Sequence, residues 1–356
     1  MTDEELPAGS ELAGRYEVRT RLGAGGMGVV YEVLDRVSLE PVALKTLRRG
    51  IADPQHIKRE FRALADITHP NLVQLYDLFD ASGLLCLTME LVRGVDLMTE
   101  LRGADLAAHT ATFAATLPDG VEPAPIVAGV GGFWPAPDLP AVRDRFAQLA
   151  RGLDALHGKG IVHRDIKPHN VRVTPEGRLV LLDFGLATVA GDAGPLAGTL
   201  AYMAPEQATG APVHPAADWY SFGILLHEVL TGKVPWTGSA HEILRRKRQD
   251  TLESLRGRAG IPDDLAAIVD ALVHPDPDRR ITGDEVLHRL GQRTRPRVES
   301  EQPSNRGLIG RRVELAQLVA AWRVAETGGS AWLAIEGGSG VGKTTLLAAL
   351  ENVATV

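Results

Sequence analysis

Five short motifs follow one another along this chain of 356 residues, and each falls in a predicted strand or loop. A glycine-rich stretch, Leu22–Val30, separates two alternating strands, and Lys45 ends a third. Three loop motifs come later, at His163–Asn170, Asp183–Gly185 and Ala204–Glu206. Each motif alone is weak, but an ordered series is not, so the series constrains the fold more than any other feature.

The first part of the chain has the pattern of a sheet. Alternating apolar and polar residues predict a half-buried strand from Tyr16 to Leu22. Further strands are predicted at Val29–Leu34, Pro41–Leu47, Leu72–Leu78 and Leu84–Leu91. Asp53 and Pro54 predict the start of a helix, in which apolar residues recur every three or four positions. Residues 1–15 are polar and acidic, and we expect a flexible tail there.

The second part of the chain is predicted to be mainly helical. Apolar stripes predict helices at Val142–Leu156, Trp219–Leu230 and Leu265–Val273. Between Gly103 and Pro140 the sequence is rich in Ala, Thr, Gly and Pro without periodicity, which indicates an insertion. Residues 292–306 have the composition of a linker, and a new segment begins at Gly307.

The glycine-rich stretch and Lys45 suit the binding of phosphates. Glycines let backbone N–H groups close over a phosphate, although a glycine-rich hairpin turn explains such a stretch about as often. The stretch does not open a helix, which argues against a dinucleotide-binding turn. Glu60 lies on the apolar side of its helix, where a carboxylate needs a partner, and Lys45 is the available cation.

Together the motifs make residues from Tyr16 to about Leu290 resemble a protein kinase, most of all the bacterial serine/threonine (Hanks-type) kinases of eukaryotic type. The resemblance implies an α+β, two-lobed kinase fold. A small, mostly β N-lobe would cover residues 16–92, and a larger, mostly α C-lobe residues 93–291, with the insertion at about 103–140.

Several single residues carry the resemblance further. Lys167, two residues after Asp165, is the serine/threonine version of the catalytic loop, and Thr199 fits the same class and is expected to bond that loop. Asp218 and Arg280 match the positions that anchor the catalytic loop and pair with Glu206.

The resemblance also implies a role for each site residue. The catalytic residues of phosphoryl transfer from ATP to protein Ser/Thr hydroxyls would be Asp165, Lys167, Lys45 and Glu60. Mg²⁺, the cofactor beside ATP, would be held by Asn170 and Asp183. The nucleotide would contact Leu22, Gly23, Ala24, Gly25, Gly26, Met27, Gly28, Val29, Val30, Ala43, Lys45, Met89, Glu90, Val92, Asn170 and Asp183. Met89 would be the gatekeeper residue beside adenine. The alternative interpretation is that Met89 is an ordinary methionine of the core.

The last segment carries a nucleotide-binding pattern of its own. Ala331–Glu336 predicts a short strand, Gly337–Thr344 matches the P-loop pattern, and Thr345–Leu350 begins a helix. The candidate phosphate-binding residues are Gly337, Gly342, Lys343 and Thr344, with a glycine-rich turn as the alternative. Gly310–Leu315 resembles the box that precedes the P-loop in AAA- and STAND-type ATPases. We expect residues 307–356 to be the truncated start of an α/β ATPase domain in a longer kinase–ATPase regulator.

Charge and composition narrow the partners. Lys and Arg number 38 against 45 Asp and Glu, a net charge of −7, which argues against nucleic acid or an anionic membrane as the main partner. Cys86 is the single cysteine, and no apolar run approaches ~18 residues, so we expect a cytoplasmic protein without a disulfide. The basic run Arg245–Arg248 could contact an acidic partner, but a solvated helix face suits the acidic chain better. The partners implied are protein substrates, and self-association for autophosphorylation is allowed.

Rival functions stay open at this point. A pseudokinase or nucleotide-sensing scaffold could regulate the attached ATPase, although the presence of every expected catalytic residue argues for an active enzyme. Residues 191–198 contain no threonine, and we hypothesise that Asp192 supplies the anion that Arg164 needs in place of a phosphothreonine. The alternative is that Asp192 is a solvated turn residue beside Gly191.

Overall fold

A computed structural model gives the structure of most of the chain. The residues it describes are 6–25, 28–47, 54–81, 83–103, 136–183, 188–189, 199–209, 212–292, 312–326, 328–330 and 332–335. They contain two compact units. The first takes the described residues of 1–68, 74–91 and 297–356, and the second those of 69–73 and 92–296.

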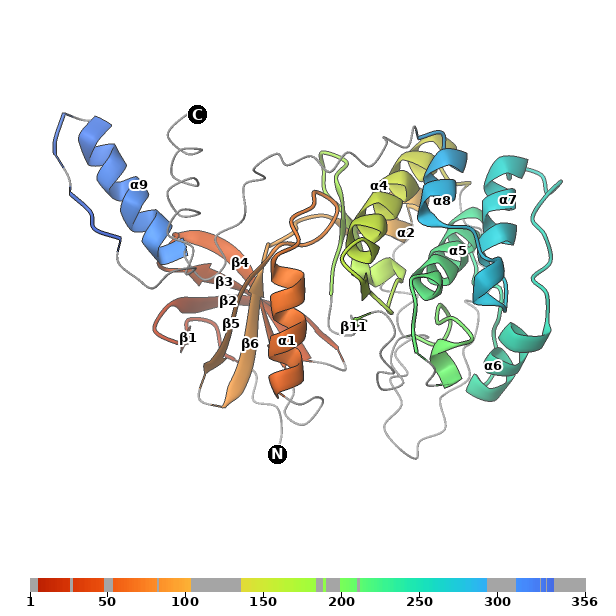
Figure 1. Cartoon of the computed structure of the whole chain (residues 1–356), viewed down its shortest axis with the longest axis horizontal. Coiled ribbons are helices and arrows are strands. Elements are labelled where there is room, and N and C mark those ends of the chain that lie inside the picture. Colours follow the sequence, from red (N-terminus) through yellow and green to blue (C-terminus); the bar gives the residue numbers. More distant parts are fainter. Residues whose placement is uncertain are drawn as a thin grey trace. The chain divides into compact units, whose positions relative to one another are not determined.

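The first unit is an antiparallel sheet with one helix beside it (Figure 1). Its strands are β1 (Glu11–Leu12), β2 (Tyr16–Gly25), β3 (Gly28–Asp35), β4 (Glu40–Leu47), β5 (Leu75–Ala81) and β6 (Leu84–Met89). They pair in the order β1-β2-β3-β4-β6-β5, and helix α1 (Pro54–Ala65) lies against β5. The strands and the helix predicted from the sequence are thus formed, with shifted ends.

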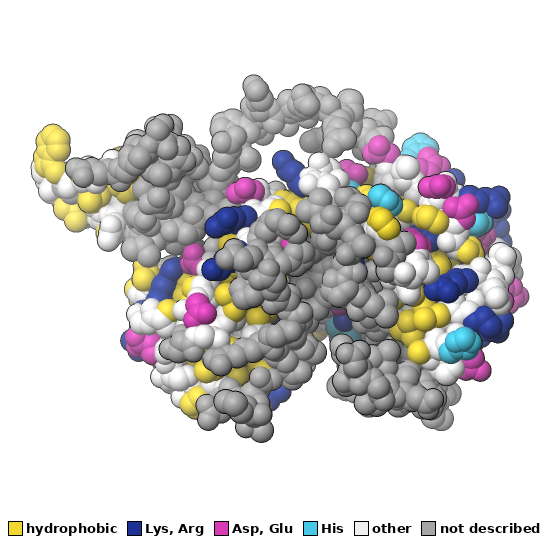
Figure 2. Space-filling model, turned by 60° about the horizontal axis from the view of Figure 1, so that its bottom comes forward, with side chains coloured by type: hydrophobic (Ala, Val, Ile, Leu, Met, Phe, Trp, Pro, Cys, Tyr) yellow, Lys and Arg dark blue, Asp and Glu magenta, His cyan; other side chains and the backbone are white. Residues whose placement is uncertain are grey.

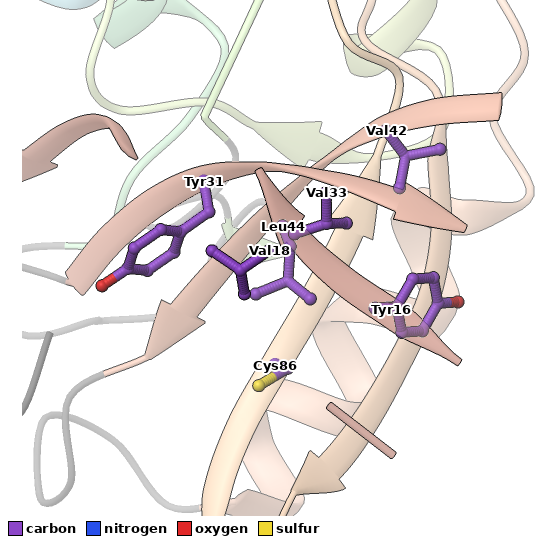
Figure 3. Close-up of a cluster of buried hydrophobic side chains, with 7 residues drawn as sticks. All are labelled: Tyr16, Val18, Tyr31, Val33, Val42, Leu44 and Cys86. Carbon is purple, nitrogen blue, oxygen red and sulfur yellow. The ribbon is translucent and has the colours of Figure 1, made fainter. Parts of the chain in front are cut away.

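A cluster of buried apolar side chains covers one face of this sheet (Figure 3). Its members are Tyr16, Val18, Tyr31, Val33, Val42, Leu44 and Cys86, which come from β2, β3, β4 and β6. Because successive residues of a strand point to opposite faces, the members from one strand are two positions apart, as are Tyr31 and Val33 in β3. The alternation that predicted these strands is therefore the alternation that builds this core.

Residues 6–15 belong to the first unit and are not a flexible tail. β1 pairs with β2, and Leu6 and Leu12 pack against the apolar cluster. Arg15 forms an ion pair with Asp35 at 2.8 Å. The prediction of a tail is wrong for these residues, because two leucines in a polar stretch are enough to fold it onto the sheet.

The strand predicted over Leu72–Leu78 begins only at Leu75. The residues before it, 69–73, belong to the second unit, where Leu72 forms a parallel bridge with Leu181. Leu72 is buried in that unit, so its side chain packs there and not on the sheet that contains β5.

The second unit is mostly helical. Its helices are α2 (Leu97–Arg102), α4 (Leu139–His157), α5 (Ala216–Thr231), α6 (Ala240–Gln249), α7 (Asp263–Leu272) and α8 (Gly283–Arg289). Its short strands are β7 (Val95–Asp96), β8 (Ile161–Val162), β9 (Val171–Val173), β10 (Leu179–Leu181) and β11 (Thr188–Val189). It also contains short 3₁₀ helices, η1 (Pro168–Asn170), η2 (Gln207–Thr209) and η3 (Pro277–Arg279).

The helical core follows the predicted apolar stripes. In α4 the whole stripe from Val142 to Leu156 is buried, and Asp138 caps the helix by accepting the amide of Ala141. Every residue of α5 from Ala217 to Leu230 is buried, which is why this helix lacks the polar face of a surface helix.

The segment after the helical unit differs from its prediction. Helix α9 (Arg312–Glu326) is formed, but residues 332–335 form no strand, and Trp332 is 98% exposed. A strand needs a neighbour for its backbone hydrogen bonds, and none of the described residues pairs with this stretch. The predicted strand is therefore wrong at 332–335. The P-loop pattern and residues 104–135 of the insertion predicted at about 103–140 lie outside the described residues, and α4 already begins at Leu139.

No helix in the described part of the chain is both long enough and apolar enough to cross a membrane.

Candidate active site

The loop His163–Asn170 connects β8 with β9 and is held from α5. The carboxylate of Asp218 accepts the backbone amides of His163 and Arg164, each at 2.8 Å. Arg164 has φ +71°, a left-handed conformation that costs an ordinary residue of order 1 kcal/mol or more. The two hydrogen bonds to one buried carboxylate stabilise this strained turn. Asp218, matched to this role by resemblance, is confirmed in it.

Asp218 is fully buried and stays ionised. Burial acts to raise the pKa of this carboxyl, but hydrogen bonds from His157 and from the amide of His163 outweigh it and leave the pKa below its ordinary value. The bond from His157 Nε2 to Asp218 Oδ2 is 2.8 Å long. A buried carboxylate with three hydrogen bonds is a rigid anchor for the loop.

His163 links the loop to Leu182, the residue between β10 and Asp183. Its Nε2 lies 2.9 Å from the carbonyl oxygen of Leu182, and its Nδ1 accepts the amide of Asp165 at 3.3 Å. The amide of Leu182 in turn donates to the carbonyl of Asn170 at 2.7 Å. The positions of Asp165 and Asp183 are therefore coupled through the imidazole and the backbone.

Asp165 is the centre of the site. Its Oδ2 lies 2.7 Å from Lys167 Nζ and accepts the side-chain amide of Asn170 at 2.9 Å. Its Oδ1 accepts the amide of Thr199 at 3.1 Å and the Thr199 hydroxyl at 3.3 Å. Lys167 Nζ also donates to the Thr199 hydroxyl at 2.9 Å. The structure thus brings together three predicted residues of the loop, and it confirms that Thr199 bonds the loop.

Asn170 and Asp183 have features that suit a cation. Both hydrogens of the Asn170 side-chain amide go to Asp165, one to the backbone carbonyl and one to the carboxylate, which leaves Oδ1 to accept a metal. Asp183 has φ +59°, a conformation that Asp tolerates better than most residues. An amide oxygen and a carboxylate are ligands that Mg²⁺ prefers.

Four of the predicted nucleotide-binding residues share one face of the first unit's sheet. In the register of β3, β4 and β6, Lys45 stands opposite Val30, and Ala43 stands opposite Met89. Partners in register point to the same face, so these side chains lie opposite the apolar cluster. Val29 lies on the other face and packs against that cluster, which separates it from the set.

Lys45 is 5% exposed, and Glu60 on α1 is half-buried. Both engage in polar interactions, and the ion pair between them stays a prediction. Leu22, Gly23 and Ala24 are exposed at the end of β2.

Gly28 is required by its backbone surroundings. It has φ +151°, and a Cβ atom there would lie 1.6 Å from the carbonyl oxygen of Thr46. The last glycine of the glycine-rich stretch therefore has a packing reason whatever it binds. Gly26 and Met27 lie outside the described residues, as do residues 190–198 with Asp192.

The buried positions of two residues near the loop, Gln207 and Lys247, were not predicted from the sequence. Gln207 is 2% exposed, donates to the carbonyl of Arg164 at 3.1 Å and accepts the amide of Ala204 at 2.9 Å. Lys247 is 1% exposed, so the solvated face predicted for Arg245–Arg248 is wrong for this residue, while Arg245 and Arg248 are exposed as predicted. The missed signal is its spacing, because Lys247 lies four residues after the buried Ile243 on α6.

Arg280 forms the ion pair with Glu206 that the resemblance implied. Its Nη1 and Nη2 lie 2.5 and 2.9 Å from the two carboxylate oxygens. The remaining guanidinium hydrogens go to the backbone carbonyls of His274, Ala216 and Pro275. All five donors of this buried side chain are used.

Comparison with known proteins agrees with this geometry. Residues 16–290 match the protein kinase domain family. Serine/threonine-protein kinase pkn2 of Myxococcus xanthus is 37% identical over 243 residues, which cover 64% of this chain and 25% of the relative. The probable serine/threonine-protein kinase pknA2 of Bifidobacterium longum is 31% identical over 288 residues, 76% of this chain and 34% of the relative.

A third relative, serine/threonine-protein kinase PrkC of Bacillus subtilis, is 29% identical over 283 residues, 76% of this chain and 39% of the relative. The chain thus spans between a quarter and two fifths of the length of these relatives. The match includes every described loop motif of the second unit. The chain belongs to the protein kinase family and carries a kinase domain of the serine/threonine type.

Proposed function

We propose that this chain transfers the γ-phosphate of ATP to Ser or Thr hydroxyls of proteins, in bacterial signal transduction. The observation that carries the proposal is the set of polar groups around Asp165. One carboxylate oxygen meets Lys167 and Asn170, and the other meets Thr199. Phosphoryl transfer needs positioning and charge neutralisation more than covalent help, and this set supplies both.

Asp165 orients the acceptor hydroxyl and receives its proton. Its carboxylate is held on two sides, so an incoming hydroxyl finds the acceptor oxygen in a fixed place. Lys167 shares its ammonium between Asp165 and Thr199, which places a positive charge beside the reacting oxygen. That charge stabilises the negative charge on the transferring phosphoryl group.

The nucleotide side of the proposal rests on Lys45 and its sheet face. Lys45 binds the α- and β-phosphates and is oriented by Glu60, while Val30, Ala43 and Met89 contact adenine. Asn170 and Asp183 would hold Mg²⁺, which would neutralise the charge of the phosphates. The remaining contacts proposed for the nucleotide are made by the glycine-rich stretch, Glu90 and Val92.

Asp165→Asn tests the proposal. Transfer of radiolabel from ATP to myelin basic protein should fall by at least about a hundredfold, because the hydroxyl loses its proton acceptor. Binding of ATP, followed by titration calorimetry, should stay within about twofold, since Lys45 is untouched. Asp284→Asn, on the exposed surface of α8, is the matched control and should keep parental activity. Equal transfer by the parent and Asp165→Asn would falsify the assignment, and no transfer by the parent would favour the nucleotide-sensing scaffold.

We also propose partners and a setting. Lys and Arg side chains are interspersed with Asp and Glu over the helical unit in the view of Figure 2, so this face carries no single-sign field for nucleic acid. This argues for proteins rather than nucleic acid as the substrates, and we propose the cytoplasm as their setting. Residues 337–344 are proposed, on their sequence pattern alone, to bind phosphate as the P-loop of an AAA- or STAND-type ATPase domain. Loss of a second ATP-binding step in Lys343→Ala would support this role.

A further inference from the structure

Lys247 on α6 ends in an ammonium group that is coordinated entirely by backbone carbonyls. Its Nζ donates to the carbonyl oxygens of Leu200 and Ala201, each at 2.8 Å, and of Met203 at 2.6 Å. An ammonium has three hydrogens, and each has one acceptor here. No acid neutralises the charge at hydrogen-bond distance among the described residues, so its partners are dipoles.

Two aromatic rings complete the surroundings of the ammonium. Nζ lies 5.4 Å from the ring centre of Tyr220 and 5.7 Å from that of Trp236. The two rings are nearly parallel, with an interplanar angle of 4°. Aromatic faces attract cations, more so in a site without water.

The segment that Lys247 holds, residues 200–203, directly follows a residue that is bonded to Asp165. Thr199, one residue before Leu200, gives its amide and hydroxyl to Asp165. The carbonyl between those bound by Lys247, that of Tyr202, accepts the hydroxyl of Ser221 at 3.0 Å. Four consecutive carbonyls, from residue 200 to 203, are therefore fixed by side chains of α5 and α6.

Burying this ammonium group costs free energy, so we ask what the chain gains from it. Burial lowers the pKa of Lys247 well below its ordinary value, which expresses the cost of keeping a charge away from water. A methionine would fill the same space without that cost. The benefit of the lysine is the fixed geometry of three carbonyls, which no apolar side chain provides.

We propose that Lys247 is a positioning residue for the acceptor protein. It holds residues 200–203 so that the chain beside Asp165 presents a preformed surface to the substrate segment that carries the hydroxyl. The inference rests on the proposed phosphotransfer function. Lys247 acts through the backbone and touches neither ATP nor the reacting hydroxyl, so its loss should affect the acceptor and not the nucleotide.

The test compares Lys247→Met with Arg248→Met in the full chain. Arg248 is the next residue of α6 and is exposed, which makes it a matched loss of one positive charge. The measurements are KM and kcat for myelin basic protein, KM for ATP, and the slow hydrolysis of ATP without acceptor. In Lys247→Met the KM for myelin basic protein should rise at least about tenfold, while the KM for ATP and the hydrolysis rate stay within about twofold. Arg248→Met should match the parent.

A purely structural role gives a different pattern. It would lower the fraction of active enzyme, so both reactions would slow together with neither KM changed, and that result overturns the proposal. If Lys247→Met is unfolded by circular dichroism, Lys247→Gln, which keeps a donor, takes its place under the same criteria. Loss of folding in both variants also overturns the proposal. An active parent whose variant keeps its KM refutes this inference alone, whereas a parent that transfers no phosphate refutes the proposed function and this inference with it.

Discussion

The Oδ1 atom of Asp165 accepts both the backbone amide and the side-chain hydroxyl of Thr199, at 3.1 and 3.3 Å. The two residues are 34 positions apart in the chain. One oxygen therefore joins the catalytic loop to the start of the segment that Lys247 holds. The amide bond requires no particular side chain, but the hydroxyl bond requires Ser or Thr.

Thr199 can be tested by removing only its hydroxyl. Thr199→Ala should lower kcat for myelin basic protein about tenfold or more, because Lys167 loses an acceptor and Asp165 a donor. Thr199→Ser should stay within about threefold of the parent. Initial rates with radiolabelled ATP measure both. A serine variant as impaired as the alanine variant would show that the methyl group, and not the hydroxyl, matters.

Arg280→Lys should destabilise the chain despite keeping the charge. The guanidinium uses five donors on Glu206 and three backbone carbonyls, whereas a lysine has three. We expect a loss of about 2–4 kcal/mol in the free energy of unfolding, measured by urea denaturation. Arg289→Lys is the control, because its pair with Glu285 is partly exposed and the change should alter stability by less than about 0.5 kcal/mol.

Asp218→Asn should destabilise the chain at neutral pH and less so in acid. Asn can accept only one of the two amides at its single oxygen, which leaves a buried N–H without a partner and costs about 1–3 kcal/mol or more. The pKa of Asp218 is lowered in the fold, so its stabilisation is complete above the unfolded pKa and is lost as pH falls below about 4. The difference in unfolding free energy between parent and variant should therefore shrink between pH 6 and pH 3. A difference that stays constant would contradict the ionised form of Asp218.

Glu228 should give the opposite pH dependence. Burial raises the pKa of this carboxyl to about 7, although the Tyr202 hydroxyl at 2.6 Å and Arg102 act to lower it. The folded chain then binds more protons than the unfolded chain between about pH 4.5 and 7, so stability falls as pH rises through this range.

Glu228→Gln removes that dependence. The unfolding free energy of the parent should drop by on the order of 3 kcal/mol more than that of the variant between pH 4.5 and 8. Glu285→Gln, at a partly exposed position, should follow the parent. If both variants follow the parent, the pKa of Glu228 is not raised.

The catalytic loop could be predicted from sequence because its chemistry is local. Asp165, Lys167 and Asn170 lie within six positions, so one turn of chain brings them together whatever surrounds it. Alternation along one strand is also local, and it assigns Lys45 and Val42 of β4 to opposite faces of the sheet.

The carbonyl ligands of Lys247 could not be predicted. A basic run on an acidic chain indicates a solvated surface, whereas the one lysine of this run, Lys247, binds the carbonyls of residues 200, 201 and 203. The same holds for residues 6–15, whose leucines find a place on the core only after β2 and β3 exist. In both cases the deciding partner lies far away in the chain or on the backbone, so the local side-chain pattern does not identify that partner.

The bond from Asp218 to the strained turn at Arg164 has a consequence for the order of events during synthesis. The loop leaves the ribosome more than 50 residues before the carboxylate that stabilises it, since the two are 54 positions apart. Until α5 emerges, the hydrogen bond from Arg164 to Asp218 cannot form, and the left-handed conformation of Arg164 is not stabilised by it. A nascent chain stalled before residue 218 should therefore be cut readily by a protease at the loop, and one stalled well beyond 231 should resist. The site thus matures late, after the residues that do the chemistry have long been made.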